Sequence, residues 1–515
     1  MSRSQSPAES ARSGAERTID RHGWPFGTVL VANRGEIALR IVRTVQSLGL
    51  EAAVVFHPVD SGAAAVQQAD RAIEIGGTTP VAAYLDAGSI LDAAQRCGAG
   101  AIHPGYGFLS ENAGFARACR DAGITFVGPS PEAIELMGDK VRACAFVKRH
   151  GFPVAPSAIE DDDPASFARR ALEIGFPLLI KPAAGGGGKG MRIVREAGQL
   201  EPELDRARSE GRRYFGDGRL YVERYVEAPR HIEVQVLGDG HGQLVHLFER
   251  ECSVQRRFQK IVEESPSPAL TPQRRQEICE TAAAIARCAG YSNAGTVEFI
   301  QGAGGEFHFL EMNTRLQVEH PVTEQLLGID LVAEQLRIAA GQPLSFAQAD
   351  LRPRGHVIEF RIYAEDPAAG YLPTTGSVLR LREPHGAGVR VDSGIVAGQQ
   401  VTAAFDPMLA KLVVSGADRT QALERADAAL RDYVLLGLRT NLGFLRRLLH
   451  HPAFVAGDVH TGFLDAHPEV AAEPALGEDT VRALLAAAAL SCRPVRDAAD
   501  AVPALHAAMG AWRNR

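Results

Sequence analysis

Short apolar segments alternate with amphipathic helical segments from Thr28 to about residue 135. TVLVA at 28–32 is followed by the turn NRGEIA, a helical pattern that continues to Leu48, and a second apolar segment, EAAVVF, at 51–56. The segments AGAIHPG at 99–105 and ITFVGPS at 124–130 continue the alternation. This order predicts a doubly wound α/β unit with a parallel sheet. Its binding crevice is expected at the carboxyl ends of the strands.

Two polar turns follow predicted strands of this unit. Asn33-Arg34-Gly35-Glu36 comes after the first strand, and His103-Pro104-Gly105-Tyr106-Gly107 comes after a later one. Asn, Gly and Pro favour tight turns whether or not a ligand is bound. Each segment is therefore compatible with a purely structural turn as well as with a binding loop.

A glycine-rich segment separates two apolar segments further along the chain. After a helix from Lys140 and the helix PASFARRALEIG, the strand PLLIKP leads into AAGGGGKG at 183–190 and then MRIVR. A strand on each side of the glycines differs from the strand–loop–helix order of a P-loop, and Gly190 stands where that motif needs Ser or Thr. A flexible turn would need fewer glycines, so we interpret the run as a cover whose backbone N–H groups close over phosphate.

The remaining pattern indicates a second, mostly antiparallel β region and a helical end. The predicted strands are HIEVQVLG, QLVHLFE, GTVEFI and FHFLEMN, with a helix between about Pro272 and Ala289. After His320-Pro321 we expect one helix up to Ala340, then mostly β structure from His356 to Val414. The helices ALERADAALRDY and LGFLRRLLHH close the main body near residue 465, and an alanine-rich tail follows.

Alternate polar residues in EMNTRLQVE predict an ion-binding face. If the backbone stays extended, Glu311, Asn313, Arg315, Gln317 and Glu319 project from one side and the residues between them from the other. A solvated strand face would alternate in the same way. Two carboxylates, two amides and a guanidinium without lysine instead favour binding of Mg²⁺, with Glu298 as a further carboxylate across a hairpin.

A basic cluster, Gln255-Arg256-Arg257-Phe258-Gln259-Lys260, precedes Glu263 and Glu264. Three cations in a short segment are also found in RNA-binding patches. Only one aromatic residue is interleaved here, and two acids follow at once. The cluster therefore favours a small anion or a phosphate group as its ligand.

Composition restricts the classes of protein. The chain has 515 residues, 45% of them hydrophobic and 23% charged, which is typical of about two to four globular domains. The net charge of -7 gives no overall attraction for nucleic acid or an anionic membrane. Seven scattered cysteines without a CxxC pair favour a reducing compartment. No transmembrane helix is predicted, and the first residues resemble a disordered extension more than a transit peptide because they include Glu9, Glu16 and Asp20.

Eight segments resemble the biotin carboxylase component of biotin-dependent acyl-CoA carboxylases. They are ANRGEIALR, IHPGYGFLSEN, MGDK, FPLLIKPAAGGGGKGM, QRRFQK, EMNTRLQVEHPVTE, RIYAEDP and FDPMLAKLVV, in this order between Thr28 and Asp465. The resemblance implies an α/β and α+β protein: a Rossmann-like (pre-ATP-grasp) domain at 28–139, an ATP-grasp domain at 140–345 with a glycine-rich lid at about 155–228, and a C-terminal biotin carboxylase domain at 346–466. Residues 1–27 are then a disordered extension. Residues 467–515 are an alanine-rich linker or the beginning of a further module.

The family implies a ligase that forms a C–N bond. MgATP, bicarbonate and biotin on a carrier protein give N1-carboxybiotin, ADP and phosphate, which is the first half-reaction of an acyl-CoA carboxylase. The implied cofactors are ATP, Mg²⁺ or Mn²⁺, and biotin from a separate carrier or a missing carrier domain. The implied partners are a biotin carboxyl carrier protein or domain, a carboxyltransferase subunit, and a second copy of the chain or a larger complex. Neither nucleic acid nor a membrane is expected, and the cytoplasm is favoured over the mitochondrial matrix.

The family's roles carry over to matching positions of this chain. The implied ATP-binding residues are Lys140, Lys181, Gly187, Gly188, Glu223, Arg224, Tyr225, Val226 and His231. The implied magnesium ligands are Glu298, Glu311 and Asn313. The implied bicarbonate-binding groups are Arg315, Gln317, Lys260 and the backbone N–H of Val318. Glu319 matches the general base, and Arg361 matches the residue that stabilises the biotin enolate. Arg361 and Tyr106 are the implied biotin-binding residues.

Elementary chemistry agrees with these roles. Bicarbonate is a poor nucleophile, so a base must deprotonate it while a cation holds it in line with the γ-phosphate, and Glu319 beside Arg315 provides this pair. The carboxyphosphate so formed would release CO₂ next to biotin. Arg361 would stabilise negative charge on the ureido oxygen of biotin.

The chain departs from the family pattern in two places. Phe258 stands where many relatives have His, which removes one polar group near the phosphates. The sequence contains no AMKM-type biotinylation motif. Biotin is therefore expected on a separate protein, or on a longer α-subunit of which this tail is the cut end.

Two other functions compete with this interpretation. Another ATP-grasp ligase would use MgATP to activate a different carboxylate, but the spacing from Arg315 to Glu319 and the following PVTE argue against it. A non-catalytic nucleotide-binding subunit has no physical reason to retain the lysines, the carboxylates and the base together. ADP formation from ATP, bicarbonate and free biotin separates the alternatives.

Overall fold

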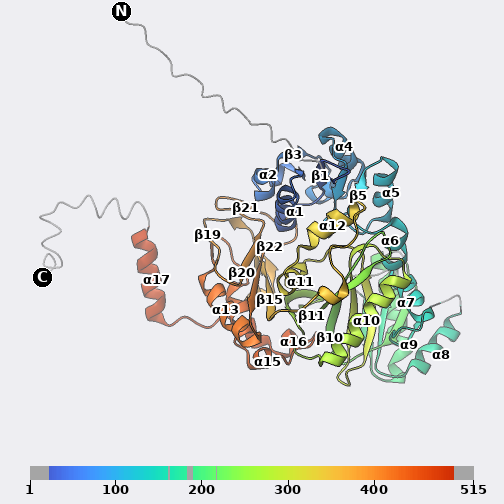
Figure 1. Cartoon of the computed structure of the whole chain (residues 1–515). Helices are drawn as coiled ribbons and strands as arrows, with labels where there is room; N and C mark the ends of the chain where they lie inside the picture. The colour runs from blue at the N-terminus through green and yellow to red at the C-terminus, as the bar shows by residue number, and fades with distance from the viewer. Residues whose placement is uncertain (1–22, 161–162, 183–189, 216, 492–515) are drawn as a thin grey trace, which may run out of the picture. The chain divides into compact units, whose positions relative to one another are not determined.

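The computed structural model describes residues 23–160, 163–182, 190–215 and 217–491 (Figure 1). The chain divides into two compact units, residues 1–470 and residues 471–515. Within its described residues the larger unit contains a five-stranded, an eight-stranded and a four-stranded sheet, together with three two-stranded ribbons. This mixed α/β architecture confirms the predicted fold class.

The first sheet is parallel and has the strand order β3-β2-β1-β4-β5. Its strands are β1 (Thr28–Val31), β2 (Glu51–Phe56), β3 (Arg71–Glu74), β4 (Ala101–His103) and β5 (Thr125–Phe126). Its helices are α1 (Gly35–Ser47), α2 (Ala64–Gln68), α3 (Pro80–Leu85), α4 (Ala87–Cys97), α5 (Ala113–Asp121) and α6 (Pro131–Met137). Both polar turns noted in the sequence follow strands of this sheet, β1 and β4. The predicted doubly wound unit is therefore present.

The eight-stranded sheet forms the centre of the larger unit. Its order is β14-β13-β10-β11-β12-β15-β22-β20, and neighbouring strands run antiparallel. The strands are β10 (Arg230–Gly238), β11 (Leu244–Arg256), β12 (Gln259–Ser265), β13 (Asn293–Gln301), β14 (Phe307–Asn313), β15 (His356–Tyr363), β20 (Val389–Ser393) and β22 (Met408–Gly416). This one sheet brings together residues from the predicted ATP-grasp and C-terminal parts.

The two faces of the central sheet differ in polarity. Ile232, Val234 and Val236 of β10 pack in one apolar cluster with residues of α7 (Lys140–Arg149) and α10 (Pro272–Cys288). Alternation along the strand therefore turns His231 and Glu233 to the opposite face, where they are still buried. The chemistry-bearing residues gather on this second face.

The four-stranded antiparallel sheet has the order β6-β9-β7-β8. Its strands are β6 (Ser157–Ile159), β7 (Leu178–Pro182), β8 (Arg192–Val194) and β9 (Leu220–Arg224), and its helices are α8 (Pro164–Ile174) and α9 (Leu200–Phe215). The glycine run joins β7 to β8, which is the predicted strand–loop–strand arrangement. Residues 183–189, including Gly187 and Gly188, lie outside the described residues.

Short helices and ribbons complete the chain. The ribbons pair β16 (Glu365–Asp366) with β17 (Leu372–Pro373), β18 (Gly376–Ser377) with β21 (Gln400–Val401), and β19 (Arg380–Arg382) with β23 (Val434–Leu436). The helices are α13 (Arg419–Asp432), α14 (Leu442–Leu449), α15 (Pro452–Val455) and α16 (Phe463–Ala466). In the smaller unit the described part contains α17 (Glu478–Ser491). Across all the described segments, every helix is too short or too polar to cross a membrane.

Two predicted boundaries were wrong. The single helix expected up to Ala340 is two helices, α11 (His320–Leu327) and α12 (Leu331–Ala339). Gly328 ends α11 in the left-handed conformation, and Asp330 caps α12 by accepting a hydrogen bond from the N–H of Ala333. The strand expected at QLVHLFE also continues to Arg256.

Candidate active site

A buried ionic cluster surrounds Lys260 on β12. Its Nζ lies 2.9 Å from Glu298 and 2.7 Å from Glu319, and it also bonds Glu233. Glu233 and Glu298 are direct neighbours on the adjacent strands β10 and β13. Burial alone would lower the pKa of Lys260, but the three carboxylates outweigh burial and hold this pKa well above its usual value. Lys260 is therefore a permanent cation in a site of carboxylates.

Glu319 lies between two cations. Its second oxygen accepts a hydrogen bond from Arg361 Nη2 at 2.9 Å, and Arg361 also bonds Glu263 through Nε at 2.6 Å. Burial alone would raise the pKa of Glu319, but Lys260, Arg361 and Arg250 hold it well below its usual value. Glu319 is therefore an ionised, oriented carboxylate, the protonation state that a general base requires.

Carboxylate and amide side chains lie on β13 and β14, the two strands beside this cluster. Glu298 and Glu311 are direct partners across the β13–β14 hairpin, as the sequence predicted. Asn313 Nδ2 donates to Glu298 Oε1 at 2.7 Å, and Lys140 Nζ lies 2.5 Å from Glu311 Oε2. Burial opposes ionisation of Glu298, but Lys260 and His231 keep the pKa of this carboxyl well below its usual value. Two carboxylates and an amide form a donor set that suits Mg²⁺.

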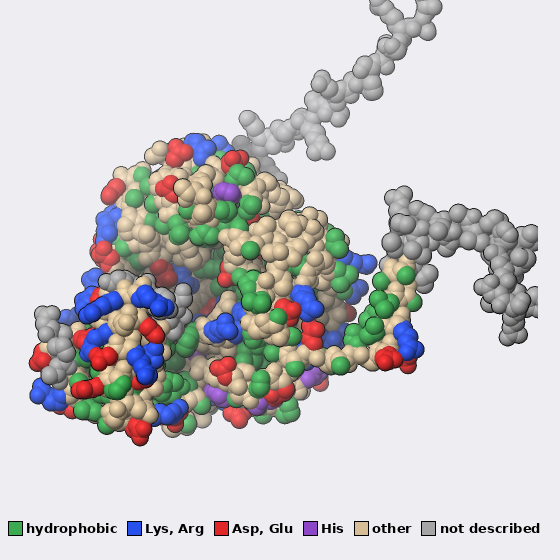
Figure 2. All heavy atoms as spheres, turned by 180° about the vertical axis from the view of Figure 1, so that it is seen from behind, with side chains coloured by type: hydrophobic (Ala, Val, Ile, Leu, Met, Phe, Trp, Pro, Cys, Tyr) green, Lys and Arg blue, Asp and Glu red, His purple; other side chains and the backbone are tan. Residues whose placement is uncertain are grey.

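A cavity of about 670 Å³ opens beside these strands, and its lining includes Glu111, Lys140, Glu311, Asn313 and Arg315. Arg315 is held in this lining by Glu111 Oε2 at 2.9 Å and by the side-chain oxygen of Asn313 at 2.9 Å. Figure 2 shows the surface hollowed between the part with α8 and α9 and the rest of the larger unit. The side chains are thus arranged around a space that can admit a ligand.

The extended backbone expected from Glu311 to Glu319 ends at Asn313. The N–H of Thr314 turns to Glu111 Oε1 at 3.2 Å, and Glu319 forms the N-cap position of α11. Leu316 and Thr314 are fully buried, so the following residues are fixed by packing instead of by strand pairing. Gln317 still reaches the cluster and donates to Glu298 Oε1 at 2.8 Å.

The predicted ATP-binding residues lie at several places. Lys181 on β7 and Glu223 on β9 form an ion pair at 2.5 Å. His231 Nε2 lies 3.0 Å from Glu298 Oε2, within the central cluster. Arg224 instead donates to the carbonyl of Ile174 at 3.2 Å, so its guanidinium is bound within its own sheet region. The backbone N–H of Tyr225 donates a hydrogen bond to the carbonyl of Pro177 at 2.9 Å, and the neighbouring Val226 is half-buried.

Arg361 and Tyr106, the residues expected to contact biotin, both neighbour Lys411. Lys411 is the direct partner of Arg361 on β22, and Lys411 Nζ donates to the carbonyl of Val318 at 2.8 Å. The ring of Tyr106 lies with its centroid 6.0 Å from the same ammonium group. Lys411 therefore links the turn at 103–107 to the segment that precedes Glu319.

The basic cluster at 255–260 is the hairpin between β11 and β12. Arg257 and Phe258 form its turn with positive φ values of 48° and 67°, and Phe258 is 64% exposed. Arg256 pairs with Glu365 at 2.9 Å, while Lys260 points into the carboxylates. The three cations therefore do not form a continuous surface patch.

Arg250 underlies the cluster and is fully buried, and it was not among the residues predicted from the sequence. It donates to Glu233 Oε1 at 2.6 Å and to Gln317 Oε1 at 2.7 Å. The charged run Glu249-Arg250-Glu251 is buried within β11, and polar residues alternate with apolar residues in HIEVQV of the paired strand β10. That alternation was the available signal for a polar interior.

Three family models match the larger unit. Residues 25–134 match "Biotin carboxylase, N-terminal domain", residues 139–347 match "Carbamoyl-phosphate synthase L chain, ATP binding domain", and residues 359–466 match "Biotin carboxylase C-terminal domain". Together these matches cover most of the chain.

Individual proteins agree with the family models. The chain is 46% identical over 443 residues to biotin carboxylase 2 of Bacillus subtilis, which covers 86% of this chain and 100% of that protein. It is 46% identical over 447 residues to the alpha subunit of the mitochondrial methylcrotonoyl-CoA carboxylase of Dictyostelium discoideum, covering 86% of this chain and 64% of that subunit.

A solved structure is also similar. It is the biotin carboxylase domain dimer of Hydrogenobacter thermophilus 2-oxoglutarate carboxylase, in complex with MgADP, ADP and bicarbonate. The TM-score is 0.83 at 44% identity, and the alignment covers 87% of this chain and 99% of that chain. With the matching family models and a full-length relative, these findings place the chain in the biotin carboxylase family, as an enzyme that uses MgATP and bicarbonate to carboxylate biotin.

Proposed function

We propose that Glu319 is the general base that deprotonates bicarbonate during its attack on the γ-phosphate of ATP. The observation that carries this proposal is the position of Glu319, an ionised carboxylate between Lys260 at 2.7 Å and Arg361 at 2.9 Å. Bicarbonate bound by Lys260 and Arg315 would place its hydroxyl near this base. Because the anion would take up part of the charge of Lys260, binding would also raise the basicity of Glu319.

Glu298, Glu311 and Asn313 are the proposed holders of Mg²⁺. The metal, when bound, neutralises charge on the phosphates during transfer. Lys140 and Lys181 each form an ion pair with a carboxylate, Glu311 and Glu223 respectively. We propose that both ammonium groups exchange these partners for phosphate oxygens when the nucleotide binds, with Gly187 and Gly188 covering it and His231 and residues 223–226 beside the nucleoside.

Arg361 is the proposed stabiliser of the biotin enolate. Its guanidinium is nine-tenths buried and reaches Glu319, so it can bind biotin next to the bicarbonate site. A fixed donor at the ureido oxygen lowers the barrier for transfer of the biotin N1 proton to the phosphate released from carboxyphosphate, because negative charge develops on the ureido oxygen. Tyr106 and the backbone N–H of Val318 complete the proposed binding surface for biotin and bicarbonate.

The biotin is proposed to be attached to a carrier protein or carrier domain. The alpha subunit of the Dictyostelium methylcrotonoyl-CoA carboxylase is longer than this chain, which spans 64% of it. This relative supports a role in the first half-reaction of an acyl-CoA carboxylase, with a carboxyltransferase as partner. The dimer named for the Hydrogenobacter domain supports a homodimer. We also propose the divisions 28–139, 140–345 and 346–466, and a cytoplasmic location that fits the scattered cysteines.

Two steps of the reaction, formation of carboxyphosphate and carboxylation of biotin, separate the proposed roles of Glu319 and Arg361. ADP release is measured with saturating bicarbonate, with and without free biotin, for the wild type, Glu319→Gln and Arg361→Ala. Glu319→Gln should lose about 10²- to 10⁴-fold in bicarbonate-dependent ADP release, with or without biotin. Arg361→Ala should retain the slow ADP release without biotin and lose the stimulation by biotin.

The exposed Arg354 provides a control, and Arg354→Ala should behave as the wild type. Nucleotide binding by all variants, followed by fluorescence of a labelled ADP, shows that they are folded. Biotin stimulation that persists in Arg361→Ala would contradict the division of roles, as would full bicarbonate-dependent turnover in Glu319→Gln.

A further inference from the structure

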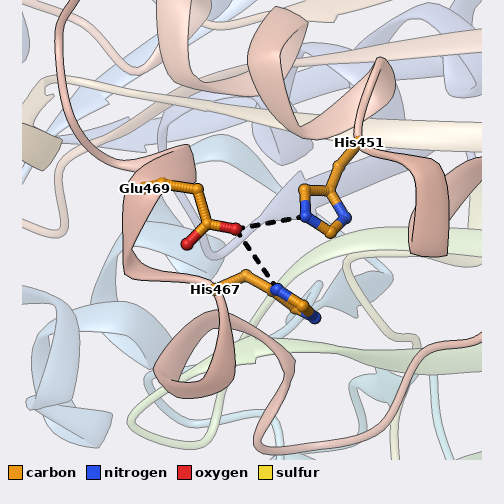
Figure 3. Close-up of side chains that lie close together, drawn as sticks. All are labelled: His451, His467 and Glu469. Atoms are coloured by element: carbon orange, nitrogen blue, oxygen red, sulfur yellow. Dashed lines mark hydrogen bonds and ion pairs between the residues drawn. The ribbon is translucent and has the colours of Figure 1, made fainter.

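Two histidines and a glutamate meet near the end of the larger unit, far along the chain from the catalytic residues (Figure 3). Glu469 Oε1 lies 3.2 Å from His451 Nε2 and 3.3 Å from His467 Nδ1. The three ligand atoms all lie within 4.8 Å of one another. One carboxylate oxygen therefore faces one nitrogen of each imidazole ring.

These separations match those of ligands that share a small metal ion. In a tetrahedral zinc site with metal–ligand bonds of about 2.0–2.1 Å, neighbouring ligand atoms are separated by about 3.3 Å. We propose that His451, His467 and Glu469 form a binding site for a divalent transition-metal ion of the Zn²⁺ class. Two imidazoles and a carboxylate favour such an ion over Mg²⁺, which prefers oxygen ligands.

The surrounding structure holds the two rings in place. The ring of Phe463 in α16 is buried and lies with its centroid 5.4 Å from that of His451 and 4.8 Å from that of His467. Arg447 of α14 donates from Nε to the carbonyl of Val470 at 2.8 Å, which anchors the segment that carries Glu469. The two rings and the segment that carries Glu469 are therefore held in place before any ion binds.

The site is accessible to an ion from solvent. The side chains of His451, His467 and Glu469 are 16%, 31% and 62% exposed. Among the described residues, two other groups of possible ligands, one with His231 and one with Cys252, are buried and share Glu233. Lys260 bonds Glu233, Glu298 and Glu319, so the carboxylates of both groups already pair with an ammonium group.

A bound ion would crosslink two segments of the larger unit. His451 stands between α14 and α15, whereas His467 and Glu469 follow α16 and directly precede the end of this unit at Val470. The crosslink would close residues 451–469 into a loop and would stabilise the attachment of this loop to the larger unit in the folded state. Its role is structural and separate from the MgATP site.

The proposal predicts one zinc ion per chain that depends on these residues. Metal-stripped full-length protein is titrated with Zn²⁺ in a chelator buffer. The number of Zn²⁺ ions bound per chain and the melting temperature of the protein are measured. The wild type should bind one Zn²⁺ and melt at a higher temperature with it. His451→Gln/His467→Gln should weaken Zn²⁺ binding by at least about tenfold and lose the shift in melting temperature.

Two variants locate the binding. His450→Gln changes the neighbouring histidine, which pairs with Asp427, and should keep the zinc. Glu298→Gln alters the catalytic cluster and should also keep it. X-ray absorption of the zinc-loaded wild type should show two imidazole ligands at about 2.0–2.1 Å. Absence of Zn²⁺ binding in the wild type would overturn the proposal. Retention of the ion in the double variant, or its loss in Glu298→Gln alone, would also overturn it.

Discussion

Arg250→Met removes the cation that lies beneath the catalytic cluster. Arg250 makes five hydrogen bonds to side chains, including Glu233, Gln317 and Thr323, and its own side chain is fully buried. Removing one member of a buried charge pair costs about 3–5 kcal/mol, because the remaining charge is left without its partner. Lys260 still neutralises part of Glu233, so we expect a loss near 3 kcal/mol in the free energy of unfolding.

Urea unfolding of the full chain measures this loss, with Arg287→Met as the control. Arg287 is an exposed arginine of α10, and its replacement should change stability by at most about 0.5 kcal/mol. Adding Glu233→Gln to Arg250→Met removes the stranded carboxylate and should recover about 0.5–3 kcal/mol. If Arg250→Met were as stable as the control, or if the second change lowered stability further, the charge-pair reasoning would be refuted.

Two further changes test burial and close packing in the larger unit. Burial raises the pKa of Glu36 to about 7, so its neutral form is favoured in the folded state and stability is lost as the pH rises from about 4.5 through 7. The free energy of unfolding of Glu36→Gln minus that of the wild type should therefore rise by about 2–3 kcal/mol as the pH rises from 5 to 8. A difference between variant and wild type that stays constant with pH would contradict this cause. An added Cβ at Gly394 would lie 2.5 Å from the backbone nitrogen of Glu36, so Gly394→Ala should destabilise by about 1–3 kcal/mol in thermal unfolding, whereas Gly62→Ala, with open space around it, should be neutral. Equal melting temperatures for the two glycine variants would show that the backbone moves apart at little cost.

The sequence was sufficient for features that depend on neighbouring residues. The hairpin that brings Glu298 close to Glu311 follows from two strands joined by a short connection, although a bulge next to Glu298 shifts the register by one residue and sets the final pairing. Likewise, the helix beginning at Lys140 follows Asp139, which accepts a hydrogen bond from the N–H of Arg142 as a cap. Local rules decide both features.

Contacts between distant segments could not be predicted in this way. Arg250 meets Gln317, 67 residues later, and Lys411 meets Val318, 93 residues earlier, because the order of eight strands brings them together. The sequence pattern of each single strand does not predict the order of the strands in the sheet. The end of the extended segment at Asn313 depends on Glu111, which belongs to the first part of the chain. His451 and His467 likewise come from different loops, at a spacing that matches no common metal motif.

Oxygen transfer from bicarbonate tests the central claim, that Glu319 directs bicarbonate as a nucleophile onto the γ-phosphate. The enzyme is supplied with ¹⁸O-labelled bicarbonate, MgATP and biotin, and the phosphate released is examined by mass spectrometry. Attack by a bicarbonate oxygen leaves that oxygen on phosphorus, so the account predicts one ¹⁸O per phosphate for each biotin carboxylated, and a loss of both products in Glu319→Gln. Phosphate that contains only unlabelled oxygen while carboxybiotin accumulates would contradict the account.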